Sequence, residues 1–122
     1  MTATIGNDVI GYNPSSTLGS GSVTITGSPT VNFATTEHVT IDGNGGTDRL
    51  TITNPAPSRD TFTPGAAPDS GTVAIAQLGL GTSLVPLEFM HIGATGSLTF
   101  AGNGSPSDIL QVNGTSNSDI FN

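Results

Sequence analysis

The sequence predicts an all-β fold, and three observations point to a parallel β-solenoid or β-roll-like module of two imperfect repeats. The chain resembles itself at a spacing of roughly 50 residues, as arrays of stacked units do. Apolar and polar residues alternate over short runs bounded by Gly, Pro, Asn and Ser. Thr is abundant at the polar positions, and its β-branched side chain suits a pleated surface. A β-sandwich is the alternative, because strand runs recurring every 8 to 12 residues or so fit both architectures.

The repeat rests on two pairs of similar segments. Gly21–Ile25 resembles Gly71–Ile75, and an apolar-x3-Glu-x-apolar-x-Ile pattern at Phe33–Ile41 returns at Leu84–Ile92. A stacked coil requires the same inward positions to recur, whereas a sandwich does not. The self-similarity therefore favours the solenoid.

The boundaries of the units follow from an Asp-x-apolar triplet, which we expect to open a strand. The triplet begins at Asp8, Asp48, Asp60, Asp108 and Asp119. A single all-β repeat domain over residues 1–122 is expected, with unit one at about 8–59 and unit two at about 60–118. The additional residues of the second unit, within Gly93–Phe100, would add a strand or lengthen a corner.

The strand runs define the expected core. They lie at Val23–Thr26, Val31–Phe33, Val39–Ile41, Leu50–Thr53, Val73–Ile75 and Leu98–Phe100. Their apolar members are expected inside, beginning with Val23, Ile25, Val31, Phe33, Val39, Ile41, Leu50 and Ile52. The Pro-rich stretches Asn54–Ser58 and Pro64–Asp69 are expected to be surface loops, since proline donates no ladder hydrogen bond.

Charge narrows the possible partners. The chain has no lysine, and Arg49 and Arg59 stand against nine acidic residues, which gives a formal net charge of -7. Several cations are needed to bind phosphates, so we expect no nucleic-acid partner and no anionic membrane surface. Divalent cations or neutral glycans remain possible partners. The lysine-free, Thr/Ser/Gly/Asn-rich composition is typical of bacterial extracellular repeat modules and favours an extracellular or cell-surface location.

One segment resembles a known repeat family. Gly43–Thr51 is close to the nonapeptide Gly-Gly-x-Gly-x-Asp-x-apolar-x, and residues 5–10 and 114–121 are degenerate versions. Here the chain resembles the hemolysin-type (RTX-like) calcium-binding repeat proteins. In that family glycine turns offer backbone carbonyls and the aspartates offer carboxylates, the oxygen ligands that Ca²⁺ requires. The resemblance implies Ca²⁺ as a cofactor, with the metal-ligating set Gly43, Gly45, Asp48, Asp108 and Asp119.

The chain departs from that family pattern. The copy at 102–110 has two additional residues before its Asp, and no second nonapeptide directly follows either copy. Ions in the family are shared between close tandem turns. The alternative is that each Asp folds its carboxylate onto nearby backbone N–H groups as an Asx-turn, without a metal.

The histidines and glutamates fall at defined positions of the pattern. Parity places Glu37 and Glu88 on the inward side, where we expect them at corners, accepting hydrogen bonds from turn amides. His38 and His91 have outward parity and are expected to be solvated. Ser and Thr abound, but no pattern places a base and an orienting acid near one of them. We therefore expect a protein that is not an enzyme.

These observations together predict a non-catalytic structural module of an extracellular or cell-surface bacterial protein. It would self-stack or self-assemble into an adhesin-like or filament array, with identical copies or neighbouring repeats as partners, since uncovered β edges are templates for pairing. The alternative is a calcium-binding or glycan-binding β module. Only Tyr12 and five Phe are available to stack on a sugar, which disfavours the glycan.

Overall fold

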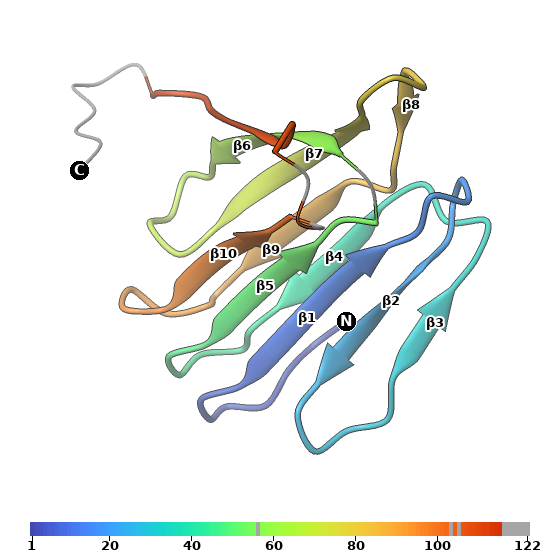
Figure 1. Ribbon diagram of the computed structural model, residues 1–122. Coiled ribbons are helices and arrows are strands. Elements are labelled where there is room, and N and C mark those ends of the chain that lie inside the picture. Colours follow the sequence, from blue (N-terminus) through green and yellow to red (C-terminus); the bar gives the residue numbers. More distant parts are fainter. Residues whose placement is uncertain (56, 103, 105, 116–122) are drawn as a thin grey trace.

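The computed structural model describes residues 1–55, 57–102, 104 and 106–115. This part of the chain contains eleven strands and no helix (Figure 1), so the predicted all-β class is confirmed. The strands are β1 (Val9–Pro14), β2 (Gly21–Ile25), β3 (Val31–Phe33), β4 (Val39–Asp42), β5 (Arg49–Thr53), β6 (Ser58–Pro64), β7 (Gly71–Gln77), β8 (Thr82–Ser83), β9 (Leu87–Met90), β10 (Ser97–Ala101) and β11 (Ile109–Val112).

The strands form two open, mixed sheets. The first has the order β10-β5-β1-β2-β3 and the second the order β11-β6-β7-β9-β4, with β8 paired to β7. In Figure 1 the strands of the first sheet lie side by side in one layer, and β4 and β9 run behind it. The layered arrangement is compatible with the sandwich-like alternative.

Each sheet combines antiparallel and parallel pairing. The antiparallel parts are β1–β2–β3 and β6–β7–β9, with neighbouring strands of each group paired in antiparallel fashion. The parallel parts join segments far apart in sequence: β1 with β5 and β5 with β10, β4 with β9, and β6 with β11. Ile10, Leu50 and Leu98 are direct neighbours across the first of these ladders.

The two antiparallel groups share one design. In the first, β1 pairs Pro14 with Gly21, and in the second, β6 pairs Pro64 with Gly71. The resemblance between Gly21–Ile25 and the start of β7 is therefore structural, since both segments follow the turn of equivalent hairpins.

The second sequence match does not stack as predicted. In the parallel pair of β4 and β9, Ile41 lies beside Phe89, whereas the sequence alignment had matched Ile41 with Ile92. The register shifts because Leu84 and Val85 precede β9 as a non-strand segment, so alternation is not continuous through that region. As expected, the additional residues of the second unit form a strand, β10, which pairs in parallel with β5 as β5 does with β1.

The core lies between the sheets and is largely the predicted one. Val23, Ile25, Val39, Ile41, Leu50 and Ile52 are buried, as are Val73 and Ile75. Phe33 is half-buried, packed against this core. Val31 is 48% exposed, so its predicted core position is wrong. It lies on β3, a three-residue strand at the edge of its sheet.

Tyr12 is the largest fully buried side chain, and the sequence did not mark it as core. Its hydroxyl donates a hydrogen bond to the carbonyl of Val85, and its ring stacks on Phe33 at a centroid distance of 6.1 Å. Burial raises the pKa of the phenol far above its usual value. Tyr12 therefore fastens β1 to the segment that leads into β9.

The predicted corner glutamates are wrong. Glu37 is exposed and precedes β4, and Glu88 points away from the core because it alternates with buried Leu87 and Phe89. Leu84 lies before Pro86 and outside β9, so the parity counted from Leu84 does not extend into the strand. His38 and His91 are exposed, as expected.

The Pro-rich stretches are only partly loops on the surface. The Pro64–Asp69 turn is largely exposed, but Asn54 and Ser58 are buried on either side of Pro55. This burial creates a polar cluster inside the protein, described below.

Candidate functional site

Three of the predicted aspartate triplets open strands, and two of these aspartates cap a neighbouring strand in the same way. Asp48 precedes β5, and its Oδ1 accepts a hydrogen bond at 2.8 Å from the N–H of Asp8, which precedes β1. Asp108 precedes β11, and its Oδ1 accepts one at 3.0 Å from the N–H of Ser58 at the start of β6. Each carboxylate thus joins two parallel strands where they begin.

This capping differs from the Asx-turn alternative. The amide held by Asp48 belongs to a residue 40 positions earlier, and the amide held by Asp108 to one 50 positions earlier. Asp8, in contrast, makes a local contact, accepting hydrogen bonds from the N–H and hydroxyl of Thr4. The capping aspartates therefore fix the stacking of strands rather than the shape of their own turns.

A glycine lies against each capping carboxylate. A Cβ on Gly43 would collide with Oδ2 of Asp48 and with the carbonyl of His91, and a Cβ on Gly102 would collide with Oδ2 of Asp108. Asp48 is fully buried, and among the described residues its Oδ2 has no hydrogen-bond partner.

The structure brings together only part of the predicted calcium set. Gly43 lies against Asp48, whereas the Cα of Gly45 faces open space, with a φ of 96°. Asp108 lies at the start of a strand in the other sheet, and Asp119 lies outside the described residues. Within the described ranges no three His, Cys, Asp or Glu side chains gather around one point. Calcium binding stays a prediction.

A buried polar cluster was missed by the sequence analysis. Asp60 was expected to open a strand, but it lies inside β6 and faces the core at 6% exposure. The Asn54 amide nitrogen lies 2.8 and 2.7 Å from the two Asp60 carboxylate oxygens, and 2.7 Å from the Ser58 hydroxyl. The Ser58 hydroxyl in turn donates to Asp60 at 3.0 Å. The parity of Ser58 and Asp60, two residues apart after a proline, was the available signal.

The environment of Asp60 favours its neutral form. Burial is the largest influence and raises the pKa of its carboxyl, and the negative charge of Asp108 acts in the same direction. The hydrogen bonds from Ser58 and Asn54 oppose this shift but do not cancel it. Gln77 completes the cluster, because it is the direct partner of Ser58 across β6 and β7 and is also buried.

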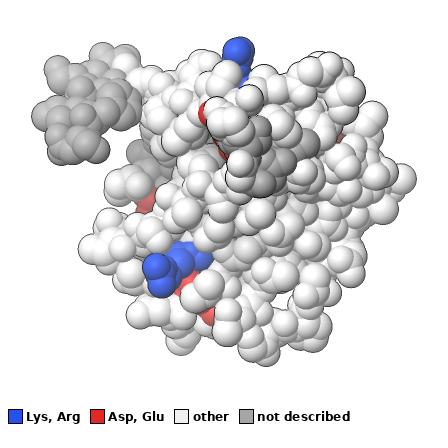
Figure 2. Space-filling view, in the orientation of Figure 1, with Lys and Arg blue, Asp and Glu red and all other residues white. Residues whose placement is uncertain are grey.

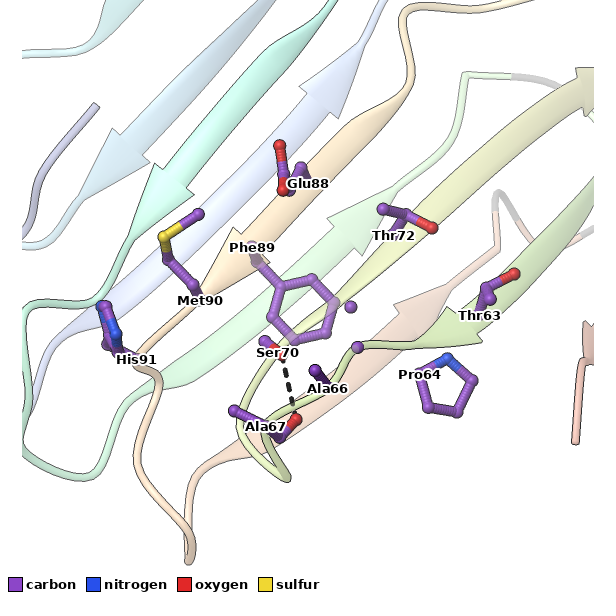
Figure 3. Close-up of a pocket in the computed structure, with 12 residues that line it drawn as sticks. Thr63, Pro64, Ala66, Ala67, Ser70, Thr72, Glu88, Phe89, Met90 and His91 are labelled. Atoms are coloured by element: carbon purple, nitrogen blue, oxygen red, sulfur yellow. Dashed lines mark hydrogen bonds between the residues drawn. The ribbon is translucent and has the colours of Figure 1, made fainter. Parts of the chain in front are cut away.

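A groove lies beside the turn of the β6–β7 hairpin. It has a volume of about 510 Å³ and is lined by the hairpin residues 63–67 and 70–72 and by β9 with the residue that follows it, 88–91. Figure 3 shows the Phe89 ring between β9 and this turn, where Ser70 donates a hydrogen bond to the carbonyl of Ala67. His91 at the rim lies 2.9 Å from Asp42, and this hydrogen bond holds the pKa of Asp42 below its usual value.

The outer edge of β10 and β11 is the most distinctive surface. In the part of the chain that the structure describes, no strand pairs with the outer side of either one. Ile109, Leu110 and Val112 on β11 are 42%, 52% and 37% exposed. The opposite edge of the second sheet is partly covered, since Thr2 bridges to Asp42 on β4. Figure 2 shows that charged side chains are sparse on the face it presents.

No family model, no curated protein and no solved structure matches the chain. None of the described residues belongs to a helix long and apolar enough to cross a membrane. The site must therefore be interpreted from its own chemistry.

Proposed function

We propose that the chain is a non-catalytic structural module that stacks with identical copies through its β10–β11 edge, within an array at the surface of a bacterial cell. The observation that carries the proposal is strand β11, which exposes Ile109, Leu110 and Val112 and has no strand on its outer side among the described residues. Natural proteins usually protect such edges with lysine, proline or a covering segment. This chain contains no lysine at all.

The parallel ladders support stacking as the mode of association. Strands β1, β5 and β10 are successive steps of one ladder, and β6 and β11 are two steps of another. We interpret these ladders as solenoid rungs from which the antiparallel hairpins project. A further rung would supply backbone partners to β10 and β11 and would cover the half-buried Leu98 and Phe100.

An identical copy is the occupant that best fits this edge. A partner must offer strands with the same alternation of apolar and Thr residues, which the chain itself repeats in β5 and β10. Recognition by opposite charge is disfavoured, because the chain carries a net charge of -7 and only two cations. Backbone pairing and aliphatic burial are then the main sources of affinity.

Analytical ultracentrifugation of the wild type and of a Leu110→Glu variant tests the proposal. The wild-type sedimentation coefficient should rise with protein concentration, and Leu110→Glu should shift this rise to higher concentration by placing a charge on the edge. Leu18→Glu is the matched control, because Leu18 is an equally apolar, exposed residue in the turn between β1 and β2. A monomer at all concentrations, or equal effects of the two variants, would contradict stacking through β11.

Calcium binding at the aspartate turn is a second candidate function. It is favoured by one observation: the Oδ2 of fully buried Asp48 has no hydrogen-bond donor among the described residues. A hard cation would satisfy this oxygen together with carbonyls of the surrounding turn. A Ca²⁺-dependent rise of the melting temperature that Asp48→Asn removes would support it, and an unchanged rise in that variant would exclude this turn as the site.

A neutral glycan is a further possible ligand. It would use the hydroxyl-bearing groove at Thr63, Ser70 and Thr72. Chemical-shift changes on titration with neutral oligosaccharides, confined to these residues, would support this use of the groove.

A further inference from the structure

A second, smaller pocket lies on the outer face of the β6–β7 hairpin, where β8 borders it. Its volume is about 270 Å³. Its walls include Arg59 and Thr61 of β6, Ala74 and Ala76 of β7, Ser83 of β8, and Pro86. The register places Arg59 beside Ala76 and Ala76 beside Ser83, so the pocket crosses three neighbouring strands.

The two hairpins can be compared residue by residue, because they share one register. Ile10 pairs with Ile25 across β1 and β2, and Asp60 pairs with Ile75 across β6 and β7. All four residues are buried, so the residues on either side of them in each strand face outward. Each residue of the second hairpin therefore corresponds to the residue 50 positions earlier in the first.

The outer faces of the two hairpins differ in the size of their side chains. In the first hairpin Gly11 pairs with Thr24, and a Cβ on Gly11 would collide with the Thr24 hydroxyl, so the threonine covers the glycine. In the second hairpin the corresponding pair is Thr61 with Ala74, and Ala74 is exposed. An alanine on the second strand thus leaves open the space that a threonine fills in the first hairpin.

The far wall of the pocket comes from a longer connection. Eight positions separate Val23 from its partner Val31, whereas fourteen separate Val73 from its partner Leu87. The additional length contains β8, which pairs back along β7 and brings Ser83 to the pocket. The pocket is therefore built from features that the second hairpin has and the first lacks.

Arg59 adds a positive charge to this pocket. It lies at the position that Val9 has in the first hairpin, and it is exposed on the outer face of β6. The chain has only two cations against nine acidic residues, yet within the described residues Arg59 forms no ion pair. A guanidinium binds a carboxylate through two parallel hydrogen bonds. The pocket thus combines a cation suited to a carboxylate with the hydroxyl groups of Thr61 and Ser83.

We propose that this pocket binds a carboxylate carried on a short aliphatic body, supplied by a free small acid or by the C-terminal residue of a peptide. Arg59 binds the carboxylate, the hydroxyls of Thr61 and Ser83 bind polar atoms beside it, and Ala74 and Pro86 contact the aliphatic part. The volume lies below the range of about 300–1,000 Å³ typical of pockets for drug-sized ligands, so the bound group is small.

The charge of the protein favours a carboxylate over a phosphate. The pocket offers one guanidinium among neutral groups, which matches a ligand with a single negative charge. A phosphate carries more charge, and the net charge of -7 on the chain repels it more strongly.

Amide chemical shifts of the full chain, titrated with N-acetylalanine, test the proposal. N-acetylalanine should shift the resonances of the residues that line the pocket, whereas its uncharged amide, the matched control ligand, should not. Arg59→Gln should weaken binding by about tenfold or more, because hydrogen bonds to a charged group are lost. Arg49→Gln removes the other cation of the chain, at the start of β5, and should bind as the wild type does.

A second variant fills the space and keeps the charge. Ala74→Leu places a larger side chain at an exposed position, so the fold should be retained and binding should be lost. Leu110→Glu, which tests the stacking edge, should leave the affinity unchanged, so the two proposals can fail separately.

The nature of the ligand can be read from the same titration. Equal affinities for propionate and N-acetylalanine would identify a free acid as sufficient, and tighter binding of N-acetylalanine would identify a peptide C-terminus. Equally strong binding of inorganic phosphate or of the uncharged amide would overturn the proposal. Binding that persists unchanged in Arg59→Gln or Ala74→Leu, or no shift in the wild type, would overturn it as well.

Discussion

The two antiparallel groups, β1–β2–β3 and β6–β7–β9, are built on the same plan and differ mainly in their interiors. Each stacks an aromatic residue of its first strand on one from its third, Tyr12 on Phe33 and Phe62 on Phe89, with centroids 6.1 Å apart in both cases. The strand between them starts with a glycine in both groups, because a Cβ there would strike the Phe33 ring in the first group and the Phe62 ring in the second. The plan shared by the two groups depends on these ring contacts and on the alternation of apolar and polar residues along the strands.

The interiors differ at one equivalent position. Buried Ile10 lies beside the apolar residues Ile25 and Leu50 of its neighbouring strands, whereas Asp60 accepts hydrogen bonds from Asn54 and Ser58. The shared hairpin plan therefore accepts a carboxylate in its interior where neighbouring side chains donate hydrogen bonds to it.

Exchange of the two residues should have unequal consequences. Ile10→Asp places a carboxylate without partners in the dry hairpin and should lower the free energy of unfolding by about 3–5 kcal/mol. Asp60→Ile removes a buried charge but leaves the Asn54 and Ser58 donors unpaired, so its cost should be clearly smaller. Urea unfolding of both variants measures the two values. Equal losses of unfolding free energy in the two variants would contradict the proposed difference between the interiors of the two hairpins.

The two glycines beside the capping carboxylates should also respond unequally. Gly43→Ala forces its methyl group onto buried Asp48 and a backbone carbonyl, and should cost about 3 kcal/mol. Gly102→Ala meets only the half-exposed side chain of Asp108, which can move, and should cost less than about 1 kcal/mol. Thermal unfolding compares them, and a larger loss in Gly102→Ala would contradict the packing described here.

Removing a hydroxyl group from one aromatic pair and adding one to the other should have different effects on stability. Tyr12→Phe leaves the buried carbonyl of Val85 without its donor and should cost about 2 kcal/mol. Phe62→Tyr adds a hydroxyl at a half-buried position and should cost less. Equal chemical denaturation midpoints for Tyr12→Phe and the wild type would show that the hydroxyl does not link the sheets.

Asp60 in the second hairpin should make the stability of the protein depend on pH. The unfolded chain ionises Asp60 near the ordinary pKa of 3.8, whereas the folded protein holds this proton to higher pH because of burial. Between the two pKa values the folded state binds more protons, so the contribution of Asp60 to stability falls as pH rises through this window. In metal-free buffer the wild type should therefore lose stability relative to Asp60→Asn as pH increases from 3.8. A constant difference across the window would contradict a raised pKa.

The strands and their inward positions could largely be predicted from the sequence, because alternation of apolar and polar residues and glycine-rich turns are local signals. The inward positions of Val23, Ile25 and Leu50 followed from parity alone. The pairing partner of each strand could not be predicted in this way, because it depends on contacts between segments far apart in sequence. Ile41, for example, lies beside Phe89, and no local pattern indicates this pairing. Asp48 was singled out correctly as a strand-opening residue, but its bond to Asp8 depends on stacking across 40 residues.

The Asp60 cluster was hidden for a different reason. A carboxylate in a strand is normally assigned to the solvent face, and only the register with Gln77 and the return of Asn54 reveal that this one is enclosed. Tyr12 was likewise counted as a possible sugar-stacking residue, whereas it is a fully buried link between the two sheets.

Amide hydrogen exchange as a function of protein concentration tests stacking through the open edge most directly. We expect the backbone amides of β10 and β11 to exchange more slowly as concentration rises, while those of β3, at the other edge of the first sheet, stay unchanged. Exchange rates in β10 and β11 that are independent of concentration, or slowing confined to β3, would contradict this account.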